Sequence, residues 1–216
     1  MPRALIFANG ELNPPYPSPA DIQAGDWLLA ADGGSLHCLS LGILPHILIG
    51  DFDSLDAELL RQLEAAGVER VTYPAHKDET DLELALDYAR GLGATDIIVY
   101  GALGGRWDMT LANLMLLAHP AFTSVKLRLV DGNQEVSLLR AGEGLELHGS
   151  QGDTISLIPL SATAEGVTTR ELEYPLSSGT LSLGSPRGVS NTMLSESCSI
   201  SLVLGLLAVV HIRHRT

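Results

Sequence analysis

The sequence predicts an α/β domain over residues 1–131, followed by an all-β sandwich or barrel domain over residues 132–216. Three observations support this prediction. The first two come from the pattern of hydrophobic residues: short apolar runs alternate with helical periodicity in the first part, and strand-like segments replace helices after the Asp131-Gly132-Asn133 turn. The third is composition, because 216 residues with 45% hydrophobic side chains can bury a substantial core.

The first part reads as strands separated by amphipathic helices. Predicted strands cover residues 4–8, 27–31, 47–49, 68–73, 96–100 and 125–130. Helical spacing is carried by three apolar sets: Leu55, Leu59 and Leu63; Leu82, Ala85, Leu86 and Ala89; and Leu111, Leu114, Met115 and Ala118. This alternation favours a mostly parallel, Rossmann-like sheet with helices packed on it.

The second part contains no long helical pattern. Short apolar or alternating segments, separated by Gly, Ser and Pro, cover residues 136–139, 145–147, 155–158, 181–183, 200–204 and 206–212. Several short strands with turn residues between them are typical of a small sandwich or barrel.

Charge and apolar runs narrow the function classes. The net charge of −13 argues against a nucleic-acid partner and disfavours an anionic membrane surface, although bound Mg²⁺ would still allow a nucleotide substrate. The longest apolar run, residues 200–210, is too short to span a bilayer, and the first ten residues lack the pattern of a signal peptide. Cys38 and Cys198 form no metal-ligand pattern, so we expect a cytoplasmic protein with two core thiols.

The pair Asp51 and Asp53 directly follows the predicted strand at residues 47–49. In open α/β sheets, ligands bind at the carboxyl ends of the strands. Two neighbouring carboxylates repel each other unless a cation lies between them, and such hard oxygen ligands suit Mg²⁺, which in turn suits phosphates. The alternative is that Asp53 or Ser54 only caps a helix beginning near Leu55.

Three further polar clusters also follow predicted strands. Because the carboxyl ends of parallel strands meet at one edge, we expect all four loops to form one crevice. The three clusters are Asp32-Gly33-Gly34, Lys77-Asp78-Glu79-Thr80-Asp81, and Gly104-Gly105-Arg106-Trp107-Asp108.

Each of these clusters has an alternative explanation. Asp32-Gly33-Gly34 fits a simple turn, and Thr80 fits the N-cap of a helix with Glu83 reaching back to it. The glycine-rich loop before a helix suits an anion, and Arg106 offers a donor fork for phosphate. Asp108 fits a helix cap, a partner that orients Arg106, or a partner of a substrate hydroxyl. The sequence contains neither a P-loop motif nor a Gly-x-Gly-x-x-Gly motif, and its histidines are scattered.

Together the four clusters resemble the thiamine pyrophosphokinase family in its compact bacterial form, over roughly residues 4–206. Asn113 fits the same pattern, and Gly188-Val189-Ser190-Asn191 is similar to the late Ser-Asn motif of the family. Two residues depart from the bacterial pattern. Met109 stands where His or another polar residue is frequent, and Thr192 stands where an acidic residue is frequent.

The resemblance implies an α/β domain for ATP binding and catalysis, a β-sandwich domain for thiamine binding and dimerisation, and a homodimer. It implies transfer of the terminal pyrophosphoryl group of ATP to the hydroxyethyl oxygen of thiamine, which gives thiamine diphosphate and AMP. ATP would lie over the sheet edge, and thiamine would lie in a cleft at the dimer interface. Ser190, Asn191 and Asp108 are the expected substrate contacts, although residues 188–191 also fit a tight turn.

We assign the remaining roles from the negative charge on the phosphate groups, which the site must neutralise during transfer. We expect Asp51, Asp53 and Asp81 to hold Mg²⁺, with Asp32 as a further ligand or a neighbour of the ligands. Arg106 and Lys77 would stabilise the transferring group, and Asp108 or Asp81 would accept the thiamine proton. The expected ATP contacts are Asp32, Gly33, Gly34, Ser54, Lys77, Thr80, Gly104, Gly105 and Arg106. Two alternatives stay open: a non-catalytic regulator that binds Mg-nucleotide, and a phosphotransferase acting on another small alcohol.

Overall fold

The computed structural model describes residues 2–53 and 55–214, so Ser54 lies outside the described residues. The chain divides into two compact units, the first ending at Gly132 and the second beginning at Asn133. Among the described residues, no helix combines the length and the apolar character needed to cross a membrane.

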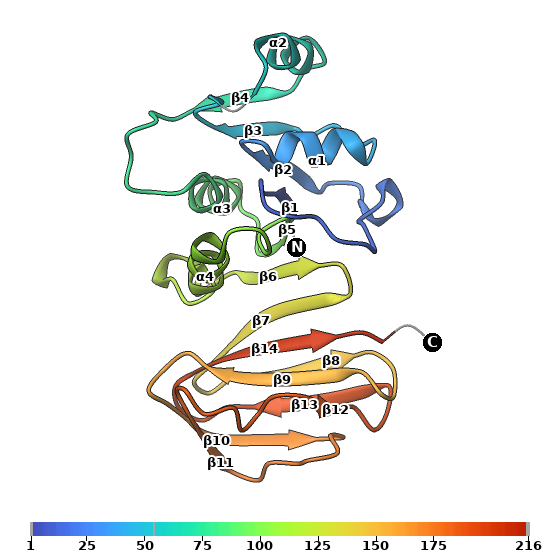
Figure 1. Ribbon diagram of the computed structural model, residues 1–216, viewed down its shortest axis with the longest axis vertical. Coiled ribbons are helices and arrows are strands. Elements are labelled where there is room, and N and C mark those ends of the chain that lie inside the picture. Colours follow the sequence, from blue (N-terminus) through green and yellow to red (C-terminus); the bar gives the residue numbers. More distant parts are fainter. Residues whose placement is uncertain (1, 54, 215–216) are drawn as a thin grey trace. The chain divides into compact units, whose positions relative to one another are not determined.

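The first unit contains six parallel strands in the order β4-β3-β2-β1-β5-β6 (Figure 1). All six lie where the apolar runs of the sequence predict them. Their bounds are β1 Arg3–Phe7, β2 Trp27–Ala31, β3 Ile47–Gly50, β4 Glu69–Thr72, β5 Asp96–Tyr100 and β6 Lys126–Asp131.

Four α-helices and two 3₁₀ turns connect these strands. The three helices predicted from apolar spacing are confirmed, whereas α1 was missed because its seven residues carry no capping signal and little periodicity. The bounds are α1 Gly34–Ser40, α2 Ala57–Ala65, α3 Asp81–Gly91, α4 Trp107–Leu116, η1 Pro19–Asp21 and η2 Pro120–Phe122.

The N-cap of α2 shows whether Asp53 caps this helix, which was the alternative to a metal-binding role. The carboxylate of Asp56 accepts hydrogen bonds from the backbone N–H groups of Glu58 and Leu59, so Asp56 is the N-cap of α2. The proposal that Asp53 caps this helix is therefore wrong. Thr80 is confirmed as the N-cap of α3, since its hydroxyl accepts from the N–H of Glu83 at 3.2 Å.

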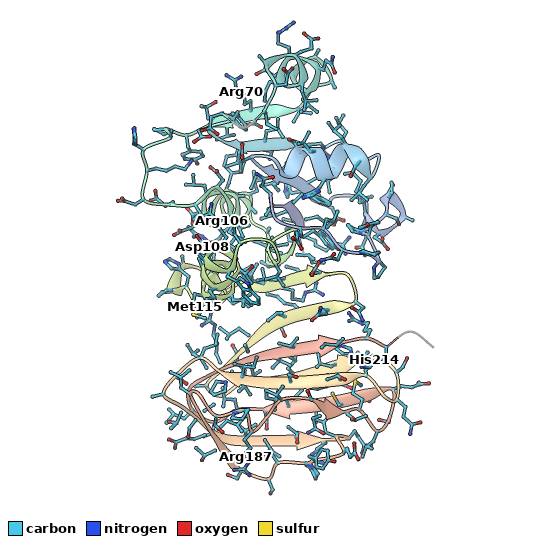
Figure 2. The ribbon with its side chains drawn as sticks, viewed as in Figure 1. Arg70, Arg106, Asp108, Met115, Arg187 and His214 are labelled. Carbon is cyan, nitrogen blue, oxygen red and sulfur yellow. The ribbon has the colours of Figure 1, made fainter. Side chains whose placement is uncertain are left out.

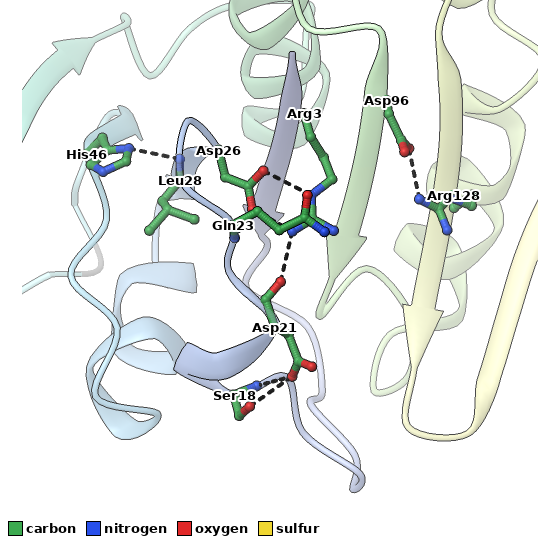
Figure 3. A network of polar contacts seen from close by, with 9 residues as sticks. All are labelled: Arg3, Ser18, Asp21, Gln23, Asp26, Leu28, His46, Asp96 and Arg128. Carbon is green, nitrogen blue, oxygen red and sulfur yellow. Dashed lines mark hydrogen bonds and ion pairs between the residues drawn. The ribbon is translucent and has the colours of Figure 1, made fainter. Parts of the chain in front are cut away.

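A buried ion pair ties the start of β1 to the loop before β2 (Figure 3). The guanidinium of Arg3 donates to both carboxylate oxygens of Asp26, at 3.0 and 2.5 Å, and to the carbonyl oxygen of Asp21. The side chain of Asp26 is only 4% exposed and also accepts from the N–H of Gln23. The hydrogen bond from Arg3 lowers the pKa of Asp26. Arg3 begins β1, so this pair lies at the amino end of the strand, away from the loops that follow the strands.

The second unit consists of two antiparallel sheets around an apolar cluster. One sheet has the order β12-β9-β14-β7 and the other has the order β11-β10-β13-β8. The bounds are β7 Gln134–Arg140, β8 Gly144–His148, β9 Thr154–Pro159, β10 Thr163–Arg170, β11 Gly179–Ser182, β12 Asn191–Thr192, β13 Ser197–Ser201 and β14 Leu206–Ile212.

Strand β10 and the two-residue strand β12 were not predicted from the sequence. In β10 the apolar alternation is interrupted, because its pairing with β11 shifts register between Ala164 and Val167, and Gly166 has a positive φ of 67°. The inward-facing apolar residues therefore do not keep the period of two on which strand prediction relies.

Candidate active site

Three carboxylates meet at the carboxyl ends of neighbouring strands β2 and β3. Asp32 follows β2, Asp51 and Asp53 follow β3, and one oxygen of each carboxylate lies within 4.8 Å of the other two. Gly50 separates Asp32 from a fourth acid, since a Cβ built on Gly50 would lie 3.4 Å from both Asp32 Cβ and Asp81 Oδ1. The structure thus brings together the acidic residues of three predicted loops.

The backbone around these carboxylates is unusual. Asp32 and Phe52 have positive φ angles of 46° and 62°, a conformation that costs free energy for residues other than glycine. Phe52 is buried in the core of the unit and anchors the loop between the two aspartates. The N–H of Asp32 donates to the carbonyl oxygen of Ile49 at 2.8 Å, which ties the end of β2 to β3. Strained backbone beside gathered carboxylates is typical of a functional site.

Repulsion within the cluster acts on the carboxyl group of Asp53. The negative charge of Asp51 raises the pKa of Asp53, and partial desolvation, a hydrogen bond with Asp51 and the charges of Asp32 and Asp81 act in the same direction. A divalent cation would relieve this repulsion, and three carboxylate oxygens are the hard donors that Mg²⁺ prefers. The residues present therefore fit a magnesium ion.

Asp81 lies beside this cluster with a different partner. Its Oδ1 accepts from Lys77 Nζ at 2.7 Å, and the side chain of Lys77 is only 12% exposed. The predicted ligand set was Asp51, Asp53 and Asp81. Among the described residues, the tight three-carboxylate group instead contains Asp32, while Asp81 is bound to a cation of the chain itself.

The glycine-rich loop after β5 leads into α4 and carries Arg106. Gly101, Gly104 and Gly105 all have positive φ angles, which only glycine adopts without strain. Arg106 is the N-cap residue of α4, and its guanidinium donates to both carboxylate oxygens of Asp108, at 3.2 and 2.5 Å (Figure 2). Hydrogen bonding by Arg106 lowers the pKa of Asp108. Of the alternatives for Asp108, the contact with Arg106 is present.

A pocket of about 420 Å³ opens between these loops. It is lined by several predicted residues, namely Asp32, Thr80, Asp81, Gly104, Gly105 and Arg106. Its other lining residues are Ala8, Asn9, Gly10, Glu11, Ala31, Leu82, Gly101, Ala102, Met109 and Asn113. Asn9 and Glu11 were missed, although Asn9-Gly10-Glu11 follows β1 just as the other clusters follow their strands. Asp51 and Asp53 do not line the pocket but lie beside Asp32, which does. Lys77 and Asp108 do not line it either but contact Asp81 and Arg106, which do.

Gly33 and Gly34 serve the packing of α1 against β1. A Cβ on Gly34 would overlap the carbonyl oxygen of Phe7, and a Cβ on Gly33 would overlap the side chain of Asn9. These two glycines thus permit the close approach that places Asp32 beside the loop after β1.

In the second unit, Asn191 is buried and holds a loop. Its Oδ1 accepts from the N–H of Tyr174 at 3.0 Å, and its Nδ2 donates to the carbonyl oxygen of Tyr174 at 2.8 Å. Ser190 has a positive φ of 62°, and its N–H donates to the hydroxyl of Ser156. The turn that the sequence left as an alternative is therefore present.

Beside this turn lies a second pocket, of about 320 Å³. Its polar lining residues are Tyr174, Arg187 and Asn191, and its apolar lining includes Leu157, Pro175, Leu176, Pro186 and Val189. Sequence reasoning named Asn191 but missed Tyr174, a residue that is 66% exposed. An exposed aromatic side chain at a pocket is a common ligand contact.

A sheet edge that gathers carboxylates, a glycine-rich loop and an arginine is the arrangement of an enzyme that handles phosphorylated substrates. Residues 21–129 match the family model described as the catalytic domain of thiamin pyrophosphokinase, and residues 144–207 match its vitamin B1 binding domain. The chain therefore belongs to the thiamine pyrophosphokinase family.

Individual relatives agree with this assignment. The chain is 33% identical to thiamine pyrophosphokinase of Bacillus subtilis over 182 residues, which cover 84% of this chain and 85% of the relative. The crystal structure of the Bacillus subtilis enzyme superposes with a TM-score of 0.87 at 29% identity, covering 99% of this chain and 100% of the other. A family protein from Enterococcus faecalis gives a TM-score of 0.85 at 28% identity, with the same coverage.

Proposed function

We propose that this chain transfers the pyrophosphoryl group of ATP to the hydroxyl oxygen of thiamine, which yields thiamine diphosphate and AMP. Family membership supports the reaction and both substrates. We place the reaction at the strand ends because Asp32, Asp51 and Asp53 lie close together there, beside the pocket that Arg106 lines. In this proposal ATP lies over the edge of a Rossmann-like parallel sheet, in a cytoplasmic enzyme whose two buried cysteines are free.

Asp32, Asp51 and Asp53 would hold Mg²⁺, with Asp81 adjacent. When bound, the ion neutralises charge on the phosphate oxygens and orients them. The three carboxylates repel one another in its absence, as the raised pKa of Asp53 indicates, and a divalent cation between them would relieve that repulsion.

Arg106 would bind the oxygens of the transferring group. Asp108 holds the guanidinium in place by two hydrogen bonds, which lowers the entropic cost of using it. The backbone N–H groups of the loop at Gly104 and Gly105 are suited to the same oxygens. The proposal thus assigns phosphate binding to a prearranged loop and side chain.

The general base has two candidates, Asp81 and Asp108. Asp108 is the weaker candidate, because Arg106 lowers its pKa and because it does not line the pocket. Asp81 lines the pocket and is held by Lys77. We therefore assign Asp81 to accept the proton of the thiamine hydroxyl, with Lys77 positioning the carboxylate.

Thiamine would contact the second unit at the turn beside Tyr174. Asn191 fixes the backbone of Tyr174, and both residues line the pocket of this unit. Replacing Asn191 with alanine should raise the KM for thiamine and leave the KM for ATP nearly unchanged. An equal rise of both KM values would argue against a thiamine contact in this unit.

A homodimer is part of the proposal, because the resemblance places thiamine between subunits. The first unit offers an apolar stripe as a further contact surface: Trp107, Leu111 and Met115 recur at intervals of four on α4 and are all exposed, Trp107 at 80%. Exposed apolar side chains that lie together on one helix face are candidates for an interaction surface. Replacing Leu111 with arginine should convert a dimer to a monomer in sedimentation experiments, while Leu44→Arg at another exposed leucine should not.

The reaction is tested by incubating the protein with thiamine, ATP and Mg²⁺ and separating the products. AMP and thiamine diphosphate in equal amounts support the proposal. ADP with thiamine monophosphate would indicate a different phosphotransferase. Nucleotide binding without any product would indicate a regulator.

A further inference from the structure

Asn113 is the one buried residue of helix α4 among its described side chains, although this helix is otherwise largely apolar. It is 5% exposed and lines the pocket at the sheet edge. Burying a polar amide costs free energy unless its hydrogen bonds are made, so its surroundings should show which partners it has.

The amide of Asn113 has one partner and lacks another. Its Nδ2 donates to the carbonyl oxygen of Ala102 at 2.7 Å, whereas its Oδ1 is buried and has no hydrogen-bond partner. This bond also fixes which atom is which, since a reversed amide would place two oxygens against each other. Asn113 Oδ1 can therefore accept a hydrogen bond from a donor on a bound ligand.

The walls of the pocket favour an aromatic ring at this depth. Ala8, Ala31, Leu82, Ala102 and Met109 form its apolar lining. Its charged and polar groups come from the acids Glu11, Asp32 and Asp81, the glycine-rich loop and Arg106. An apolar wall beside a buried acceptor without a partner suits a flat heteroaromatic ring that carries a donor.

We propose that Asn113 Oδ1 accepts a hydrogen bond from the amino group of an aminopyrimidine ring bound in this pocket, and so selects substrates that carry this amine. The inference rests on the proposed function, because both substrates contain the group: adenine carries it at its 6-position and thiamine on its pyrimidine ring. An oxo group in the same place would direct an oxygen at Oδ1 and be rejected.

Analogues in which an oxo group replaces the amine show whether Asn113 recognises the amine of adenine or that of thiamine. Calorimetry would give dissociation constants for ATP and inosine triphosphate, and for thiamine and oxythiamine. The unmodified protein should prefer the amine by at least about tenfold in one of these pairs, as expected for a buried acceptor that loses its donor. Asn113→Ala should bring that ratio close to one.

Thr110 provides the matched control. One turn earlier on α4, its hydroxyl donates to the carbonyl oxygen of Gly104 at 3.4 Å, but it does not line the pocket. Thr110→Val removes a bond between helix and loop and should leave both ratios unchanged. Because a ratio of dissociation constants does not depend on the fraction of folded protein, partial unfolding would not imitate the effect.

Unchanged ratios for Asn113→Ala in both pairs would overturn the inference and leave Asn113 as a link between α4 and Ala102. An equal change for Thr110→Val would overturn it as well. A protein that prefers the amine in binding but forms no AMP would refute the proposed function and leave the inference standing.

Discussion

Replacing Asp53 with asparagine should lower turnover by about 100-fold or more, the scale of losing one preorganised electrostatic element of a site. The substitution keeps the shape of the side chain and removes one of three carboxylates whose oxygens lie within 4.8 Å of one another. The assay is the rate of AMP formation at saturating ATP and thiamine over a range of Mg²⁺ concentrations.

The same substitution should not weaken the folded state. The charge of Asp51 raises the pKa of Asp53, so ionised Asp53 is unfavourable in the metal-free protein. Asp53→Asn should therefore melt at the same or a higher temperature without Mg²⁺ and should gain less stability than the unmodified protein when Mg²⁺ is added. Loss of turnover without loss of stability distinguishes a functional carboxylate from a structural one.

Asp56→Asn is the matched control, since it makes the same chemical change three residues away. Asp56 caps α2, and asparagine caps helices about as well as aspartate, so both turnover and melting temperature should stay close to those of the unmodified protein. Near-normal turnover of Asp53→Asn, or an equal loss in Asp56→Asn, would refute the assignment of Asp53 to the metal.

Three further predictions concern titration and packing. Asp51→Asn removes the largest cause of the raised pKa of Asp53, so the midpoint of Asp53 in a carboxyl NMR titration should fall towards its ordinary value. In the unmodified, metal-free protein, the raised pKa means that Asp53 favours folding at low pH and that this contribution is lost as pH rises through the raised value. Asp26→Asn should cost about 3–5 kcal/mol in denaturant unfolding, because it leaves Arg3 largely buried without its partner. Asp26 stabilises the fold above its unfolded pKa, and this contribution is lost as pH falls through its lowered value. Gly34→Ala should cost roughly 1–3 kcal/mol in the same measurement, since its Cβ would overlap the backbone.

The two packing changes, Asp26→Asn and Gly34→Ala, each have a control on the same chain. Asp87 pairs with Arg90 on the exposed surface, so Asp87→Asn should change stability by no more than about 1 kcal/mol. Gly91 has open space around its Cβ position, so Gly91→Ala should be neutral or stabilising. Equal costs for a test variant and its control would show that the buried environment is not the cause.

Strands β1, β2, β3 and β5 could be predicted because each is a short, mostly buried apolar run that ends in a polar loop. Helices α2, α3 and α4 could be predicted from apolar spacing. Helix α1 could not, since its start depends on glycines that fit against Phe7 and Asn9, a tertiary contact without a local signal. Strand β10 was missed because its register shift removes the alternation on which strand prediction depends.

The loops of the site could be placed from the rule that parallel strands end at one edge, but the partners within the site could not. Sequence spacing does not show that Lys77 binds Asp81 or that Asp32 joins the pair Asp51 and Asp53, because these contacts depend on how the loops fold back over Gly50. The sequence likewise does not show that Asn113 Oδ1 is buried without a hydrogen-bond partner, because this depends on the residues that surround it in the fold.

The central claim is that a pyrophosphoryl group moves intact from ATP to thiamine. The most direct measurement uses ATP labelled at its β-phosphorus, with thiamine and Mg²⁺, and follows the label into the separated products. Attack of the thiamine oxygen on the β-phosphorus predicts that all transferred label appears in thiamine diphosphate and that the AMP carries none. Label that stays with the nucleotide as ADP, while thiamine gains a single unlabelled phosphate, would contradict the account.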